Sequence, residues 1–150
     1  MYKNILVPVL LDDGDTAAKS YAVAQALADK GAKFTVMHVL EEIPGFVSAE
    51  IPGDIVEKTH VAAEQSLKQS AKALPGATAH LARGHAGTRI IDYASQHNID
   101  CIVITSHKPG VSDFFLGSTA ARVVRHAEWI EQPVVWKFLS GVITHPGIPI

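Results

Sequence analysis

Short continuous apolar runs alternate along the chain with longer segments in which apolar residues recur every three or four positions. The runs predict strands that are covered on both faces of a parallel sheet, and the recurring spacing predicts amphipathic helices. We expect strands at residues 3–9, 34–40, 78–83, 101–105 and 133–139. We expect helices from the turn at 12–16 to Gly31, and over about 54–74, 86–97 and 118–127.

This alternation of strand and helix indicates the fold class. Five strands separated by four helices favour right-handed crossovers and a doubly wound α/β fold, with helices on both faces of a five-stranded parallel sheet. The expected strand order is 3-2-1-4-5. At 150 residues the chain has the length of one domain, which we assign to 1–139, followed by an irregular, Pro- and Gly-bearing tail at 140–150.

Composition and charge exclude several classes of protein. Apolar residues make up 47% and charged residues 19% of the chain, the balance of a soluble globular domain. The net charge of −2 gives no field that attracts nucleic acid, and no apolar run approaches the ~20 residues of a membrane span. The eight histidines are scattered, and the single Cys101 lies in a predicted strand. We therefore expect a cytoplasmic protein with no metal centre and no nucleic-acid or membrane partner.

The loop between the strand at 101–105 and the helix at 118–127 carries the strongest candidate chemistry. Gly117 precedes Ser118 and Thr119, so backbone N–H groups and two hydroxyls meet at the positive end of a helix, where an anion can bind. Lys108 adds a cation to the loop. An ordinary serine N-cap is the competing interpretation. Because ligands of such sheets bind beyond the carboxyl ends of the strands, we favour a phosphate site.

Several segments resemble the universal stress proteins. The likeness covers about residues 1–127 and is carried by Lys-Asn-Ile-Leu-Val-Pro-Val at 3–9, Met-His-Val at 37–39, the stretch 84–93, Ser106-His107 and above all the block 116–127. The resemblance implies a stress-response regulatory protein that binds ATP or a similar adenine nucleotide, alone or with Mg²⁺, with little or slow hydrolysis. It also implies a homodimer formed through the edge of the strand at 133–139, or a higher homo-oligomer.

The resemblance also implies the nucleotide-binding residues. ATP-binding members carry Gly-x2-Gly-x9-Gly-Ser/Thr in this loop, whereas here only the closing Gly117-Ser118 matches strictly. An aspartate usually follows Pro-Val on the ribose side, where this chain has Leu10, so Asp12 or Asp13 takes that role unless it only caps a helix. Adenine is expected to rest against the backbone and side chains of Val9 and Val39. The full predicted set is Pro8, Val9, Asp12, Asp13, Val39, Thr105, Ser106, His107, Lys108, Gly110, Gly117, Ser118 and Thr119.

Other functions stay open beside nucleotide binding. Thr105 and Lys108 occupy the first two glycine positions, which favours the alternative of a dimeric interaction module of the same family that binds no nucleotide. A phosphorylation receiver would need an acceptor aspartate after the third strand, but the chain reads Ala-Arg-Gly-His at 82–85. A flavodoxin-like domain would need a hydroxyl-rich loop after the first strand. A P-loop NTPase would need Gly-x4-Gly-Lys-Ser/Thr, which is absent from the sequence.

Overall fold

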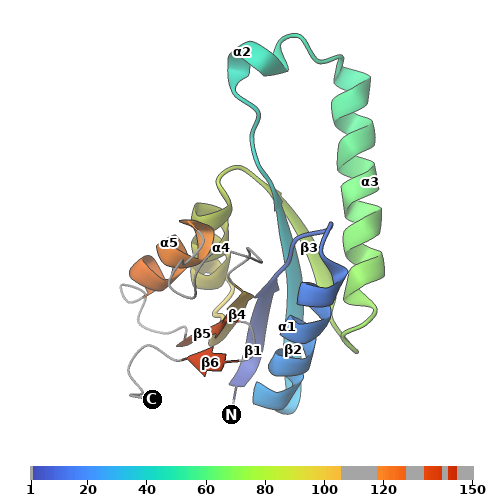
Figure 1. Cartoon of the computed structure of the whole chain (residues 1–150). Coiled ribbons are helices and arrows are strands. Elements are labelled where there is room, and N and C mark those ends of the chain that lie inside the picture. The colour runs from blue at the N-terminus through green and yellow to red at the C-terminus, as the bar shows by residue number, and fades with distance from the viewer. Residues whose placement is uncertain (1, 106–117, 128–133, 140–141, 145–150) are drawn as a thin grey trace.

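The computed structural model describes residues 2–105, 118–127, 134–139 and 142–144. The sheet order is β3-β2-β1-β4-β5-β6, with helices on both faces (Figure 1). The predicted α/β fold with a parallel sheet is confirmed. In chain order the elements are β1 (Tyr2–Pro8), α1 (Gly14–Leu27), β2 (Ala28–Leu40), α2 (Gly45–Ser48), α3 (Gly53–Ala71), β3 (Thr78–Arg83), α4 (Ala86–Gln96), β4 (Cys101–Thr105), α5 (Ser118–Ala127), β5 (Val134–Leu139) and β6 (Val142–Thr144).

The predicted count of five strands is wrong, because the described residues form a sheet of six strands. β5 pairs in parallel with β4, and β6 runs antiparallel to β5, from Lys137↔Thr144 to Leu139↔Val142. The segment 140–150, predicted to be wholly irregular, therefore contains a strand. β5 is also not the free edge that was expected to carry the dimer. A three-residue strand leaves no readable period in the sequence, and its pairing with an otherwise open edge is what defines it.

Two apolar clusters fill the two faces of the sheet. Ile5 and Val7 of β1 pack in the cluster that includes residues of α1 and α3, whereas Leu6 packs in the cluster that includes residues of α4 and α5. Consecutive strand residues point to opposite faces, and all three of these side chains are fully buried. Both faces of β1 are thus covered, as its continuous apolar run predicts.

The boundary between α1 and β2 differs from the prediction. The helix was expected to reach Gly31 but ends at Leu27, and β2 begins at the next residue. The β1–β2 pairing shifts register between Tyr2 and Asn4, and Gly31 has a φ of +77°, in the left-handed region that favours glycine. Gly31 therefore marks a bulge within a strand and not the end of a helix.

A projection extends beyond the sheet on the side of the carboxyl ends of the strands (Figure 1). It consists of the connection after β2, the single turn of α2, and the first turns of α3; we call residues 41–61 the arm. The sequence predicted a loop as far as Gly53, and α2 is a short helix inside that loop. Among the helices that the structure describes, none is long and apolar enough to cross a bilayer.

Candidate functional site

The candidate site begins where β2 continues beyond the end of β1, beside the point at which the strand order reverses. The β1–β2 ladder ends at Pro8↔Met37, and the Val9 N–H then donates to the Met37 carbonyl at 2.8 Å. Backbone groups of alternate strand residues point to the same side, so the N–H and C=O of Val39 point toward β1 at a level where β1 has ended. The ladder supplies no partner for them there. One donor and one acceptor are left at the sheet edge for a planar ring.

The backbone of Val9 is held in place by β2. Its carbonyl lies 2.8 Å from His38 Nδ1, and because a carbonyl oxygen only accepts, the His38 ring donates to it. The half-buried His38 ring thus fixes the end of β1 beside Val39. His38 was missed by the sequence analysis, although a polar residue inside an apolar strand was the available signal.

The side chains of Val9 and Val39 lie on opposite faces of the sheet. Val9 packs in the cluster with residues of α1 and α3, and Val39 in the cluster with residues of α4 and α5; each side chain is only 9% exposed. The two side chains cannot form one wall for an adenine ring. Both side chains pack in the core, so a ligand at this edge could reach Val39 only through its backbone N–H and C=O.

The neighbouring carboxylates Asp12 and Asp13 have different surroundings. Asp13 accepts hydrogen bonds from the Thr16 N–H at 3.0 Å and from Thr16 Oγ1 at 2.5 Å, so it is the N-cap of α1. Asp12 is exposed in the same turn, four residues after Pro8 ends β1. The structure therefore gives Asp13 the capping role and leaves Asp12 as the carboxylate that is open to solvent.

Two groups cover the positive end of α4, which starts at this edge. At α4, His85 Nδ1 accepts from the Thr88 N–H and Glu41 Oε1 accepts from the Ala86 N–H, each at 3.4 Å. No acidic residue occurs in the first turn of α5. The first turn of α4 also lacks an acidic residue, and the residues before α5 lie outside the described part of the chain, so the anion site at the start of α5 stays a prediction. The contact of Glu41 with α4 was missed, because 45 residues separate the two groups in the sequence.

The two ends of the predicted phosphate loop lie on described elements. Thr105 is the last residue of β4, and Ser118 and Thr119 are the first two residues of α5. Both ends therefore lie on the side of the sheet where β1 and β2 end. The loop residues Ser106, His107, Lys108, Gly110 and Gly117 lie outside the described residues, and their part in the site stays a prediction.

A metal site would need several ligand side chains close together. Nowhere in ranges 2–105 and 118–127 does a group of three or more His, Cys, Asp or Glu side chains gather around a common point. Mg²⁺ is usually held mainly by phosphate oxygens with one or two carboxylates. A metal that accompanied a nucleotide here would find Asp12 as an exposed carboxylate of this edge.

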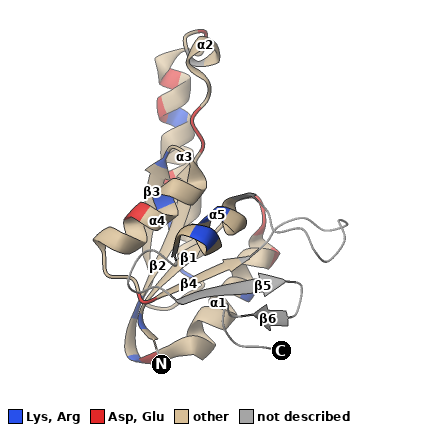
Figure 2. Cartoon of the chain, turned by 90° about the vertical axis from the view of Figure 1, so that its left-hand side faces the viewer, with Lys and Arg blue, Asp and Glu red and all other residues tan. Residues whose placement is uncertain are grey.

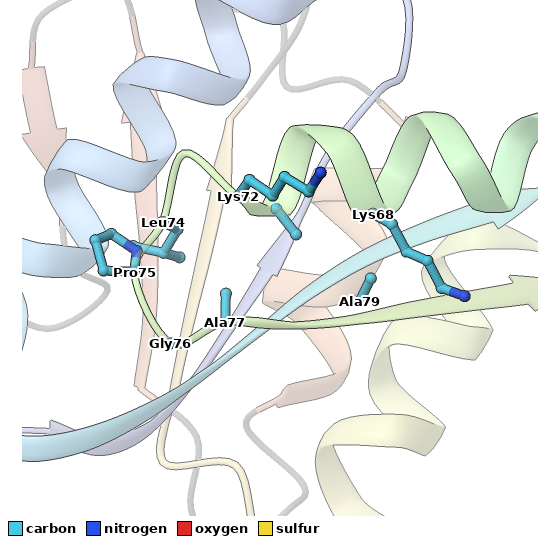
Figure 3. Close-up of a pocket in the computed structure, with 8 residues that line it drawn as sticks. Lys68, Lys72, Leu74, Pro75, Gly76, Ala77 and Ala79 are labelled. Atoms are coloured by element: carbon cyan, nitrogen blue, oxygen red, sulfur yellow. The ribbon is translucent and has the colours of Figure 1, made fainter.

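A cavity of about 310 Å³ lies at the opposite end of the strands, beside the start of β3 (Figure 3). Lys68 and Lys72 line it from the end of α3. Lys68 pairs with Glu64 at 3.4 Å, and Lys72 donates to Gln69 at 3.2 Å. Lysines at a helix C-terminus complement its negative end, so the cavity needs no ligand to explain its charges.

The sequence and the fold of this chain are similar to those of known proteins. The model of the universal stress protein family matches residues 1–134. Universal stress protein G of Escherichia coli O157:H7 is 29% identical over 138 residues, which cover 85% of this chain and 94% of that protein. The solved structure of hypothetical protein MJ0577 has a TM-score of 0.73 at 24% identity, covering 94% of this chain and 99% of that chain.

The universal stress protein from Archaeoglobus fulgidus, solved in complex with dAMP, has a TM-score of 0.58 at 18% identity and covers 95% of this chain and 98% of that chain. At these identities, the two structures establish a shared fold. The family model spans far more than half of the chain. This chain belongs to the universal stress protein family.

Proposed function

We propose that this chain binds an adenine nucleotide, ATP, at the carboxyl edge of the sheet and acts as a stress-response regulatory protein. The observation that carries the proposal is the extension of β2 beyond β1, which leaves the N–H and C=O of Val39 without ladder partners. A purine edge that presents one acceptor and one donor matches such a pair. The dAMP complex of the Archaeoglobus fulgidus protein, which has the same fold, supports the choice of an adenine nucleotide.

The remaining parts of the nucleotide follow from this placement. The exposed Asp12 is the carboxylate available for the ribose hydroxyls, because Asp13 is bonded to Thr16. The phosphates lie at the first turn of α5, where backbone N–H groups and the hydroxyls of Ser118 and Thr119 can donate. Gly117 permits close approach of a phosphate to the backbone, and Lys108 supplies a positive charge.

Turnover is expected to be slow. Fast phosphoryl transfer needs a positioned water, metal ions and groups that stabilise charge in the transition state. The P-loop motif is absent from the sequence, and the described residues gather no cluster of carboxylates or histidines at this edge. Occupancy of the site, and not catalysis, is therefore the proposed signal.

The first test is whether purified protein carries or binds a nucleotide. We expect chromatography of the denatured protein to release an adenine nucleotide, and calorimetry on the emptied protein to show ATP binding. Gly117→Val should abolish binding while the fold is retained. Ser118→Ala should weaken binding by about 0.5–3 kcal/mol, the range for a lost neutral or charge-assisted hydrogen bond. Undiminished affinity in both variants would place the phosphates elsewhere.

The two aspartates form a matched pair for the ribose assignment. Asp12→Ala should weaken ATP binding and leave the free energy of unfolding within about 0.5 kcal/mol of the original, since exposed positions tolerate change. Asp13→Ala should lower the free energy of unfolding by about 0.5–2 kcal/mol, the cost of a lost N-cap. Denaturant titration and calorimetry on both variants separate the roles. Equal affinities in all three proteins would remove Asp12 from the site.

A second candidate function is a dimeric interaction module that binds no nucleotide. Thr105 and Lys108 at the first two glycine positions favour it, and so does the apolar surface of the arm, where Phe46 is 80% exposed. Absence of any adenine nucleotide from the native protein, together with no heat of ATP binding, would favour this function over the first.

A further inference from the structure

The arm gathers nearly all the large apolar side chains that the described residues expose. Leu10 is the one such side chain outside it, and Phe46 is the most exposed at 80%. The exposed members in the arm are Ile43, Phe46, Val47, Ile55 and Val61. A patch of this kind on a projection costs hydration free energy unless another surface covers it, so it marks an interaction surface.

The rest of the domain does not cover the arm. Every side chain that the structure describes from 41 to 62 is exposed or half-buried, and the first buried side chain of α3 is Ala63. The part of α3 before Ala63 therefore extends beyond the core, as Figure 1 shows. Since the described part of the domain leaves this apolar surface in water, the surface that covers it comes from a binding partner.

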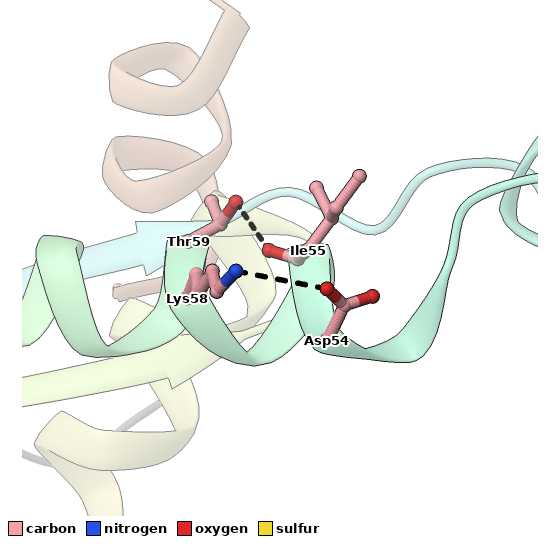
Figure 4. Close-up of polar contacts among 4 residues, drawn as sticks. All are labelled: Asp54, Ile55, Lys58 and Thr59. Carbon is pink, nitrogen blue, oxygen red and sulfur yellow. Dashed lines mark hydrogen bonds and ion pairs between the residues drawn. The ribbon is translucent and has the colours of Figure 1, made fainter.

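The arm is also where the negative charge of the chain is concentrated, as the acidic residues in Figure 2 show. Residues 41–61 contain five Asp and Glu and one lysine, whereas the rest of the chain has ten acidic against twelve basic residues. That lysine, Lys58, lies 3.7 Å from Asp54 within α3 (Figure 4). Glu50 and Glu57 are exposed and make no ion pair with a described residue. The arm thus offers carboxylates to a basic partner.

The spacing of these residues indicates the shape of that partner. Asp54, Glu57 and Val61 follow one another at intervals of three and four residues, so they lie on one face of α3, with acidic and apolar side chains next to each other. A surface that matches this face has apolar side chains flanked by Lys or Arg. An amphipathic helix with a basic polar face has that arrangement.

We propose that the arm binds a basic amphipathic helix of a different protein. Phe46 and the other exposed apolar side chains of the arm cover the apolar stripe of that helix, and Glu50 and Glu57 face its Lys and Arg side chains. Nucleic acids and anionic membranes are excluded as partners, because their phosphates are repelled by the acidic arm. The arm of a second copy is repelled in the same way. This interaction is independent of nucleotide binding.

A synthetic helix serves as the probe. It is a fluorescent peptide of about 18 residues with Leu at every third or fourth position and Lys elsewhere, so that it forms a basic amphipathic helix. One comparison peptide has the same composition in scrambled order, and another has Glu in place of Lys. In about 0.15 M salt, we expect fluorescence anisotropy to show binding of the Leu/Lys peptide at least about tenfold tighter than either comparison peptide. No binding below about 100 µM would overturn the proposal.

Two variants test whether the peptide binds at the arm. Phe46→Ser should weaken binding at least about tenfold, as loss of a central aromatic contact does. Its thermal unfolding should match the original, because the ring is 80% exposed. The double variant Glu50→Lys with Glu57→Lys should lose the Leu/Lys peptide to a similar extent and gain affinity for the Leu/Glu peptide, since it reverses the charge and keeps the apolar side chains.

The matched controls lie outside the arm and should keep the original affinity. Leu10→Ser removes a large apolar side chain that is 48% exposed, and Asp15→Lys with Asp29→Lys makes the same change in net charge as the double variant. Equal losses in the controls and the arm variants would overturn the proposal, because overall charge would then explain the binding. So would sedimentation in which Phe46→Ser separates copies of this chain while peptide affinity is unchanged, since the arm would then bind a second copy.

Discussion

A stack of three rings joins β3 to α4. The His80 and Tyr93 ring centroids are 4.5 Å apart, and those of Tyr93 and His97 are 3.8 Å apart with nearly parallel planes. Burial, followed by the nearby His97, holds the pKa of His80 below its ordinary value of 6.5. The neutral form of His80 is therefore favoured by folding. Above pH 6.5 its contribution to stability is fully present, and it is lost as pH falls through the lower folded-state pKa.

We predict that the unfolding free energy of the original protein falls more steeply below pH 6.5 than that of His80→Phe, which keeps a ring against Tyr93. The imidazole signals in NMR titrations should place the His80 pKa below 6.5, and His97→Gln should raise it only partway, since burial is the larger cause. A His80 signal that titrates at or above 6.5 would contradict this account.

At the scale of secondary-structure elements, the close contact of α4 with α5 depends on Gly87. A Cβ on Gly87 would lie 2.8 Å from Arg122 Cδ and 3.1 Å from Arg122 Cβ, closer than packed side chains tolerate. Gly87→Val should therefore cost about 1–3 kcal/mol through overpacking. The few tenths of a kcal/mol gained by removing glycine from a helix do not offset that cost.

The same substitution in an Arg122→Ala background provides the control, because the clashing atoms are then absent. Denaturant unfolding of the four proteins in this cycle should show that most of the cost disappears. An equal cost in both backgrounds would mean that Gly87 is required for another reason. Since α5 also begins at the proposed phosphate site, Gly87→Val should weaken ATP binding as well.

At the scale of the whole molecule, β6 covers part of the sheet edge that β5 would otherwise expose. It pairs antiparallel with the last three residues of β5, whose apolar run would otherwise present unpaired backbone groups. A chain that ends at Leu139 should therefore form species larger than the intact protein in light scattering at micromolar concentration. In the intact chain Thr144→Pro removes a backbone donor of β6 that faces Lys137 of β5, and it should act in the same direction. Identical masses for all three proteins would show that β6 does not protect this edge.

Local patterns in the sequence determined the class of the fold and many of its elements. The bounds of β3, β4 and α5 match the prediction, because continuous apolar runs and helical periods are properties of neighbouring residues. The ends of the predicted phosphate loop, Thr105 and Ser118, match the described ends of β4 and α5 for the same reason. The sequence did not determine which of Asp12 and Asp13 caps α1, because aspartate is suited both to a helix cap and to a ligand contact.

Only the tertiary structure decided the features that depend on residues far apart in the chain. The backbone N–H and C=O of Val39 lack ladder partners because β2 extends beyond the end of β1. Glu41 accepts a hydrogen bond at the start of α4, although the two groups are 45 residues apart in the sequence. The pairing of β6 likewise depends on where β5 lies in the sheet. The register of two strands, the groups that cap a helix and the strand that covers a sheet edge all depend on how separate elements pack. The periodicity of a single segment does not reveal them. The exposure of Phe46 belongs to the same class, because an apolar residue in the sequence does not reveal whether a neighbouring element covers it.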